Sequence, residues 1–265
     1  MAISLNGRTQ LYPLLGDPII YARSPDWLSK RMAERGMNMI SLPMEVPEGA
    51  LGTVVAALAE TRNVVGFSLT MPHKIAGYAY CHSVSETSRL SGVVAAIRRN
   101  ADGSWYGHTT DGDAFVKAQL DNGAKIAGAK VLVLGAGGAG SAIAISMLAA
   151  GAAEVVVNDV DPARAERIVN LLKDKDGDRI RVGTNDPRGF DIVSNATPMG
   201  MAEGDPIPLD TSLLSPSMFV GDVIAGHGET PLIKAAKGIG CRTADGDAMV
   251  VAVLDVMCDF VLGAY

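Results

Sequence analysis

The sequence predicts an α/β fold with two domains: an N-terminal α/β domain with a mainly parallel sheet, and a C-terminal domain of the doubly wound type. Three observations lead to this prediction. Short apolar runs alternate with helix-like segments over residues 11–67, and the alternation restarts at Lys130. The chain has 265 residues, of which 48% are hydrophobic and 20% charged, so it can bury one large core or two medium ones.

The first half of the chain follows a strand–helix alternation. Strands are expected at 11–15, 39–43 and 64–67, with helices at 25–35 and 49–60 between them. A βαβαβ order favours a parallel sheet with right-handed crossovers.

A hairpin and a helix follow this alternation. Two apolar runs at 93–99 and 104–107 flank a turn that contains Asp102-Gly103. The next helix is expected over 112–122 and ends at Gly123, which suits a helix C-cap.

The second half repeats the alternation. Its strand candidates are 131–134, 154–159, 180–183, 191–197, 218–224 and 240–243. If the last twenty residues form a helix, apolar residues lie on all of its sides, which indicates that it is buried and returns to the first domain. We therefore expect a substrate-binding catalytic domain at 1–108 plus 246–265 and a dinucleotide-binding domain at 109–245.

Residues 131–153 carry no charge and are long enough to span a bilayer. However, their glycines cluster near one end, after a short branched strand, and the helical part at 140–150 is too short to cross a membrane. We therefore interpret the run as strand, loop and helix, and expect no membrane partner.

Charge and cysteine content narrow the function. The net charge is −6 and the basic residues are dispersed, so we expect no nucleic-acid partner and a small-molecule substrate instead. The three cysteines are far apart, which argues for a reducing compartment, and the N-terminus lacks a signal-peptide pattern. We expect a cytoplasmic protein, either monomer or homodimer.

The segment GAGGAG at 135–140 fits the G-x-G-x-x-G pattern directly after a strand and at the start of a helix. The first glycine permits a tight turn, the second lets the backbone approach a pyrophosphate, and the helix N-terminus attracts negative charge. This context predicts a Rossmann-type NAD(P) site that includes Gly135, Gly137, Gly138 and Ala139. The alternative is a glycine turn used only for close packing.

Asp159 lies nineteen residues after Gly140, at the end of a strand. A carboxylate there accepts hydrogen bonds from a ribose diol and repels a 2′-phosphate, so NAD is favoured over NADP. The alternative is that Asp159 caps the helix that begins after Asp161-Pro162.

Lys74 and Asp111 are the candidate catalytic pair. Lys74 follows the carboxyl end of a predicted parallel strand, where open α/β sheets bind ligands, and Asp111 precedes a predicted helix. An ammonium and a carboxylate can orient one hydroxyl and exchange its proton. Taken singly, the residues also fit a solvated loop lysine and a helix N-cap.

The histidines do not indicate a metal site. The four histidines lack zinc-ligand spacing and no Cys-x-x-Cys occurs, so no metal is expected. We expect His73 to be a partly exposed loop residue; the alternative places it in the pocket beside Lys74.

Seven motifs occur in order along nearly the whole chain: GDPIIYARSP (16–25), SLTMPHK (68–74), HTTDGDAF (108–115), GAGGAG (135–140), NATPMGM (195–201), GDVIAGHGETPL (221–232) and DGDAMV (245–250). Together they resemble the shikimate/quinate dehydrogenase family. SLTMPHK looks like its Asn-Val-Thr-x-Pro-x-Lys segment, and HTTDGDAF is similar to its Asn-Thr-Asp-Gly segment.

The resemblance implies an oxidoreductase that exchanges a hydride between NAD(P) and a CH–OH group. It implies that Lys74 and Asp111 are catalytic and that Asn158-Asp159-Val160 replaces an Asn-Arg-Thr segment, which again favours NAD. The other residues that it assigns are Ser24, Ser68 and Thr70 for the substrate and Thr197, Met199 and Gly246 for the cofactor.

The substrate shell departs from the family pattern at six positions where hydroxyl, amide or phenol groups are expected: Ala22, Ser68, Ala95, Thr109, Ala225 and Val253. Each lost donor forfeits about 1–3 kcal/mol where a substrate group is left unpaired. We therefore expect the chemistry to be kept on a small cyclic or carboxylated alcohol other than shikimate, in a larger and more apolar pocket. The alternatives are a non-catalytic NAD-binding sensor and shikimate dehydrogenase proper.

Overall fold

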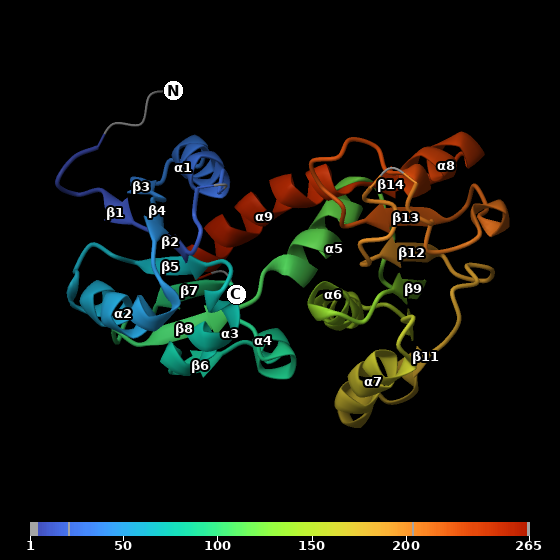
Figure 1. The fold of residues 1–265 in the computed structure, drawn as a ribbon, viewed down its shortest axis with the longest axis horizontal. Helices are drawn as coiled ribbons and strands as arrows, with labels where there is room; N and C mark the ends of the chain where they lie inside the picture. The colour runs from blue at the N-terminus through green and yellow to red at the C-terminus, as the bar shows by residue number, and fades with distance from the viewer. Residues whose placement is uncertain (1–4, 21, 203, 264–265) are drawn as a thin grey trace. The chain divides into compact units, whose positions relative to one another are not determined.

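The computed structural model describes residues 5–20, 22–202 and 204–263, which form two compact units (Figure 1). The N-terminal unit contains the described residues up to Thr110 together with those from Leu254 onward. The C-terminal unit runs from Asp111 to Val253. The assignment of substrate binding to 1–108 plus 246–265, and of dinucleotide binding to 109–245, stays a prediction.

The N-terminal unit is built on a six-stranded sheet in the order β4-β2-β5-β7-β8-β6. The strands are β2 (Leu14–Gly16), β4 (Pro43–Glu45), β5 (Gly66–Leu69), β6 (Ser83–Val84), β7 (Ala96–Arg99) and β8 (Trp105–His108). β2 pairs in parallel with β4 and β5, whereas β7 runs antiparallel to β5 and β8, as the predicted hairpin requires.

Two of the predicted strands are each divided into two. The run 11–15 becomes β1 (Gln10–Leu11) and β2, and the run 39–43 becomes β3 (Met39–Ile40) and β4. β1 and β3 form a separate two-stranded parallel sheet. The division of the first run falls at Tyr12 and Pro13. Tyr12 and Leu14 still donate to the Ile40 and Leu42 carbonyls at 2.9 and 2.8 Å, while the Pro13 carbonyl accepts a hydrogen bond from the Ser68 N–H of β5 at 2.8 Å.

Helices α1 (Ser24–Glu34) and α2 (Leu51–Glu60) cover this unit. α2 buries Leu51, Val55 and Leu58, which are spaced along one helical face, in a core shared with Phe67 and Ile97. The remaining elements of the unit are η1 (Glu48–Ala50), α3 (His73–Ala76), η2 (Gly77–Tyr80) and α4 (Glu86–Ser91).

Helix α9 (Gly246–Val261) contributes its last turns to the N-terminal unit. Phe260 is fully buried and stacks on Tyr106 and His108, at ring-centroid distances of 6.0 and 5.5 Å. Asp255 pairs with Arg31 at 3.2 Å. The end of the chain is therefore an integral part of the core of the first unit.

The C-terminal unit has a six-stranded, fully parallel sheet in the order β11-β10-β9-β12-β13-β14. The strands are β9 (Lys130–Leu134), β10 (Glu154–Asn158), β11 (Ile180–Val182), β12 (Ile192–Asn195), β13 (Phe219–Asp222) and β14 (Arg242–Ala244). The chain runs outward from β9 to β11 and then returns to β12 on the other side. This is the doubly wound order, and its switch point lies between β9 and β12.

Helices connect these strands. They are α5 (Asp111–Asp121), α6 (Gly138–Ala149), α7 (Pro162–Asp176) and α8 (Pro231–Ile239), with η3 (Gly177–Arg179) and η4 (Thr211–Leu213). α6 packs on β9 and β10, α7 on β10 and β11, and α8 on β13 and β14. The uncharged run 131–153 thus forms most of β9, a loop and α6, and no helix in the described part of the chain is long and apolar enough to cross a membrane.

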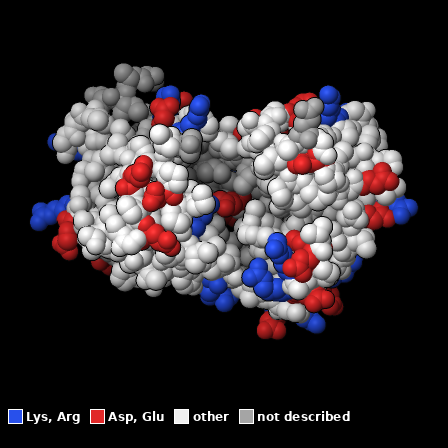
Figure 2. Space-filling view, viewed as in Figure 1, with Lys and Arg blue, Asp and Glu red and all other residues white. Residues whose placement is uncertain are grey.

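Acidic and basic side chains are both distributed over the face shown in Figure 2. Exposed ion pairs among the described residues include Lys30–Asp26 at 2.7 Å and Arg181–Glu154 at 2.6 Å. This face therefore carries no extended basic patch.

The packing of α5 against α6 depends on Gly112. A Cβ at this position would lie 2.3 Å from the Ala142 carbonyl oxygen and 2.5 Å from Ser146 Oγ. Because both are closer than atoms can approach, the helices must separate to admit a methyl group.

We expect Gly112→Ala to lower the free energy of unfolding by about 1–3 kcal/mol, the usual cost of overpacking a core. Thermal unfolding followed by circular dichroism measures the effect. Gly238→Ala, in the exposed last turn of α8 with no atom within 4 Å of its Cβ position, is the matched control. It should be neutral or stabilise by about 0.5–1 kcal/mol; equal melting temperatures for the two variants would contradict the packing argument.

Candidate active site

In the N-terminal unit, the predicted substrate residues lie at the carboxyl end of β5. Ser68 is buried within the strand, opposite Ala96 of β7. The half-buried Thr70 follows the strand, and its N–H donates to the Leu15 carbonyl of β2 at 3.0 Å. Lys74 is half-buried in α3, a single turn of helix.

The loops after β2 and β5 run side by side. The Asp17 N–H donates to the Met71 carbonyl at 3.0 Å. A Cβ on Gly16 would lie 2.3 Å from Thr70 Cγ2, so only glycine permits this approach of the β2 end to Thr70. The two strand ends that the sequence marks with GDP and SLTMPHK are therefore brought together.

The β7 side of this region is apolar. The Ala95 carbonyl accepts a hydrogen bond from the Leu69 N–H, and its own N–H donates to the His108 carbonyl, at 2.8 and 2.9 Å. Ala95 therefore lies beside the end of β5 with a methyl group where the family pattern has an asparagine. The preceding residue, Val94, donates its N–H to the Lys74 carbonyl at 2.9 Å.

The expected exposure of His73 is wrong, because the side chain is fully buried. Its Nε2 lies 2.6 Å from the Val46 carbonyl oxygen. Since a carbonyl can only accept, Nε2 carries the proton and donates. The ring is buried because α3 places it over the end of β4, which the sequence did not reveal.

The other two residues of the substrate and catalytic prediction open helices. Ser24 is the half-buried first residue of α1 in the N-terminal unit. Asp111 is the half-buried first residue of α5 in the C-terminal unit.

In the C-terminal unit, the glycine segment forms a tight turn between β9 and α6. Gly135 has a φ of +97°, which favours glycine. A Cβ on Gly140 would lie 1.9 Å from the Gly135 carbonyl oxygen, so the third glycine is required by the loop itself. Gly137, by contrast, has no atom within 4 Å of its Cβ position.

This geometry fits a dinucleotide pyrophosphate. Gly137 and Gly138 face open space at the N-terminus of α6, a twelve-residue helix with unpaired N–H groups in its first turn. A ligand phosphate can approach this backbone closely because no side chain intervenes. Packing alone explains Gly140 but leaves Gly137 unexplained.

Asp159 follows β10 and is tied to the glycine loop. Its Oδ2 accepts the Ala136 N–H at 2.7 Å, and its Oδ1 accepts the Asp161 N–H at 2.9 Å. The next helix is capped by Asp161, whose side chain accepts the Ala163 N–H, so the alternative of Asp159 as helix cap is wrong. Asn158 supports the same turn, because its backbone carbonyl accepts the Gly135 N–H at 2.7 Å.

A buried polar network positions Thr197 and Met199, and the sequence analysis missed it. Asn195 Oδ1 accepts both the N–H and the hydroxyl of Thr197, at 3.0 and 2.7 Å, and Thr197 Oγ1 accepts the Met199 N–H at 3.1 Å. Asn195 Nδ2 donates to the Asp222 carboxylate at 3.1 Å, which also accepts the Thr230 hydroxyl at 2.7 Å. Polar residues at the ends of the neighbouring strands β12 and β13 were the available signal.

Burial raises the pKa of Asp222 above its usual range, although hydrogen bonds from Thr230, Ile224 and Asn195 oppose the shift. The carboxyl group is completely shielded from solvent. Asp222 therefore serves to order the two loops rather than to contact solvent or ligand.

The remaining residues of the cofactor prediction lie at the same edge of the sheet. Thr197 Cγ2 would be 2.9 Å from a Cβ on Gly135, which places the loop after β12 against the glycine turn. Gly246 lies against the loop after β13, since its Cβ would be 2.3 Å from the Ile224 carbonyl oxygen. The structure thus brings the predicted cofactor residues to the carboxyl ends of β9, β10, β12 and β13.

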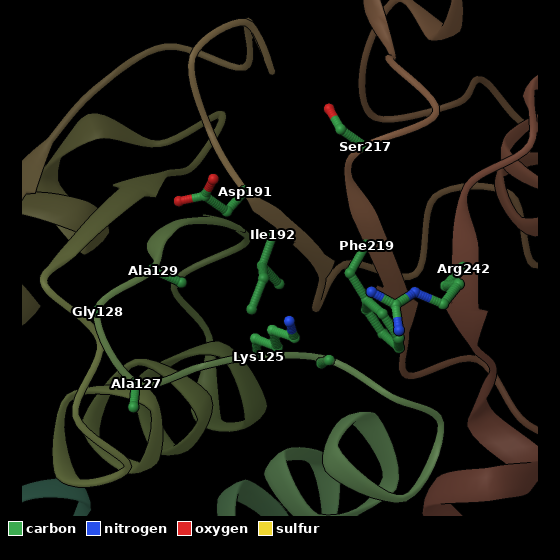
Figure 3. A pocket seen from close by; sticks show the side chains of 10 residues that line it. Lys125, Ala127, Gly128, Ala129, Asp191, Ile192, Ser217, Phe219 and Arg242 are labelled. Atoms are coloured by element: carbon green, nitrogen blue, oxygen red, sulfur yellow. The ribbon is translucent and has the colours of Figure 1, made fainter.

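A pocket of about 300 Å³ lies at the opposite edge of this sheet, at the amino ends of the strands (Figure 3). Its lining includes Lys125, Asp191, Phe219 and Arg242. Arg242 lies beside the end of α5, because its Nη1 would be 2.9 Å from a Cβ on Gly123; positive charge there offsets the partial negative charge of helix carbonyls. The pocket contains none of the predicted cofactor residues.

Among the residues that the structure describes, no group of three or more histidine, cysteine, aspartate or glutamate side chains is placed to hold a metal ion.

Comparison with known proteins matches this arrangement to one family. Residues 14–97 match the shikimate dehydrogenase substrate binding domain. A shikimate dehydrogenase (NADP(+)) of Rubrobacter xylanophilus is 35% identical over 257 residues, which cover 93% of this chain and 88% of the relative. The chain belongs to the shikimate/quinate dehydrogenase family. The resemblance noted in the sequence is thereby confirmed, and the enzyme class is that of NAD(P)-dependent dehydrogenases acting on CH–OH groups.

Solved structures share the fold over the full chain. The ligand-free 5-ketofructose reductase of Gluconobacter sp. strain CHM43 has a TM-score of 0.86 at 28% identity and covers 98% of this chain and 100% of its own. Shikimate 5-dehydrogenase from Listeria monocytogenes, in complex with shikimate and NAD, has a TM-score of 0.86 at 26% identity, with coverages of 100% and 99%. The predicted two-domain α/β fold of this family is confirmed.

The contrast between Gly137 and Gly140 gives a test of the dinucleotide site. Gly137→Ala should leave the melting temperature unchanged and weaken NAD binding by about tenfold or more, because its methyl group occupies space that only a ligand would fill. Gly140→Ala should lower both stability and binding, because its methyl group meets the Gly135 carbonyl. Titration of each variant with NAD by calorimetry, beside thermal unfolding, separates the two effects; unchanged NAD affinity in Gly137→Ala would contradict the site.

Proposed function

We propose that this protein is an NAD-dependent dehydrogenase that interconverts an alcohol and a ketone on a small cyclic or carboxylated substrate other than shikimate. One observation carries the proposal. The end of β5 keeps Thr70 and Lys74, while the adjoining position, where the family pattern has an asparagine, is the buried Ala95. The reacting groups are retained and part of the recognition shell is not.

In this proposal Lys74 and Asp111 act on one substrate hydroxyl. The Lys74 ammonium donates a hydrogen bond to the oxygen that becomes a carbonyl, and the Asp111 carboxylate accepts its proton. Bound NAD supplies the hydride acceptor. Thr70 and Ser24 orient the substrate through their hydroxyl groups.

The changed substrate follows from the missing polar groups. The six departures from the family pattern include three alanines and a valine, which cannot hydrogen-bond a carboxylate or hydroxyl through their side chains. Each unpaired substrate group costs about 1–3 kcal/mol, so several together would be prohibitive for shikimate. One structural relative is named 5-ketofructose reductase. Because 5-ketofructose is a neutral ketose, the same fold occurs in a protein that is named for a substrate other than shikimate.

The substrate is tested by following NAD reduction over cyclic polyols, hydroxy acids, aromatic alcohols and neutral polyols, with shikimate and quinate in the same series. We expect turnover of at least one of these compounds. The kcat/KM for shikimate should be lower than the kcat/KM for that compound by at least about a hundredfold. Efficient turnover of shikimate would contradict the change of substrate. Binding of these compounds without any NAD reduction would favour the second candidate, a non-catalytic NAD-binding sensor, which the lost recognition groups also fit.

Lys74→Ala tests the chemistry. Loss of a positioned acid–base group should lower kcat by about 10²–10⁴-fold while NAD affinity stays the same. Lys125→Ala, which removes a lysine from the pocket at the other edge of the C-terminal sheet, is the matched control and should keep full turnover. Wild-type turnover in Lys74→Ala would overturn the assigned role.

Asp159 is the proposed determinant of NAD preference. Each of its oxygens accepts one backbone N–H and keeps a lone pair for a ribose hydroxyl. Asp159→Asn removes the charge but keeps one acceptor, so the ratio of kcat/KM for NAD over NADP should fall by about tenfold or more.

Asp159→Arg should reduce the same ratio further by attracting the 2′-phosphate. Asp161→Asn is the control, because it removes a neighbouring charge and retains the helix cap. If Asp161→Asn changed the ratio as much as Asp159→Asn, general electrostatics rather than contact with the ribose would explain the preference.

A further inference from the structure

We propose that His73 is a positioning residue that holds the backbone of Lys74 in its catalytic place through the hydrogen bond from Nε2 to the Val46 carbonyl. The inference rests on the proposed role of Lys74. It adds a residue that does not touch the substrate and acts only through its neighbour.

The helix that carries Lys74 cannot hold itself in place. α3 has four residues, His73–Ala76, and continues directly into the four-residue 3-10 turn η2; a helical segment this short is unstable in isolation because nucleation costs more than its few hydrogen bonds return. Its N-cap, Pro72, provides no side-chain cap. The position of Lys74 therefore depends on contacts that α3 makes with the sheet.

His73 closes a ring of hydrogen bonds around the ends of three strands. The Thr70 N–H donates to Leu15 in β2, and the Val46 N–H, after β4, donates to Gly16 at 3.0 Å. The Val46 carbonyl accepts His73 Nε2–H at 2.6 Å, and the His73 N–H returns to the Thr70 carbonyl at 2.8 Å. The start of α3 is thus fixed to β2, β4 and β5 together.

Lys74 is held from the other side as well. Its carbonyl accepts the Val94 N–H at 2.9 Å, from the segment that leads into β7. Without the His73 side chain, Lys74 would lose the tether to β4. The Val94 bond to its carbonyl and the backbone bond of His73 to Thr70 would remain, but the displaced backbone would open the Val94 bond more often. The predicted result is a displaced backbone rather than an unfolded unit.

The imidazole of His73 leaves one buried nitrogen unpaired within the described part of the chain, and the hydrogen bond that its other nitrogen donates explains why a histidine stands here. Nδ1 of His73 is buried and has no hydrogen-bond partner among the described residues. An apolar side chain of similar size would fill the space without leaving a nitrogen unpaired. What histidine adds at this position is the bond to Val46.

The test compares His73→Leu with His73→Gln. Glutamine presents an N–H at a similar reach and should restore the bond, whereas leucine fills the space without a donor. We expect His73→Leu to lower kcat by about 10–100-fold, because misplacement by about 1 Å can cost that much, with KM and NAD affinity changed less than threefold. His73→Gln should recover kcat to within about threefold of wild type.

A stability control and a structural readout complete the experiment. Val55→Ala truncates a core residue of α2 and should lower the melting temperature without lowering kcat, which separates position from stability. Hydrogen exchange of the Val94 amide, which donates to Lys74, should be faster in His73→Leu than in His73→Gln or Val55→Ala.

The outcomes distinguish this inference from the function on which it rests. If Lys74→Ala is inactive and His73→Leu retains wild-type kcat, the role of His73 is wrong and the proposed function stands. If Lys74→Ala is active, the proposed function fails, and exchange at Val94 alone decides whether His73 fixes the Lys74 backbone. Failure of glutamine to recover activity and exchange would also overturn the inference.

Discussion

Where a parallel strand ends, its backbone groups lose their ladder partners, and in both units the loops supply new ones. After β5, the Thr70 N–H donates to the Leu15 carbonyl, and the His73 side chain donates to the Val46 carbonyl. At the end of β12, Asn195 accepts two hydrogen bonds from Thr197. Because buried backbone groups must be satisfied, the residues that satisfy them also fix the loops that would face ligands.

The sequence was most informative where chemistry imposes a backbone requirement. The glycine segment could be predicted because a tight turn, an open approach and a close helix contact each exclude side chains, and the structure shows the first and third of these at Gly135 and Gly140. Lys74 could be singled out from its distance beyond an apolar strand. In each case the local pattern carries the constraint.

Features that depend on partners distant in sequence were not predictable. The burial of His73 depends on Val46, and the order of the Thr197 loop depends on Asp222 and Thr230, all of which come from other segments of the chain. The division of the run 11–15 into β1 and β2 was missed because the apolar pattern continues across it. Hydrophobic periodicity locates elements, but it does not identify which polar groups meet.

The contribution of Leu254 and later residues to the N-terminal unit has a consequence for synthesis on the ribosome. The C-terminal unit is continuous in sequence from Asp111 to Val253, so all of its strands are synthesised before Phe260. The N-terminal unit is begun first, yet Phe260 can reach its place beside Tyr106 only after the whole of the C-terminal unit has been synthesised. The portion made earliest therefore closes its core late, and until then the apolar surface that Phe260 covers must be protected by other means.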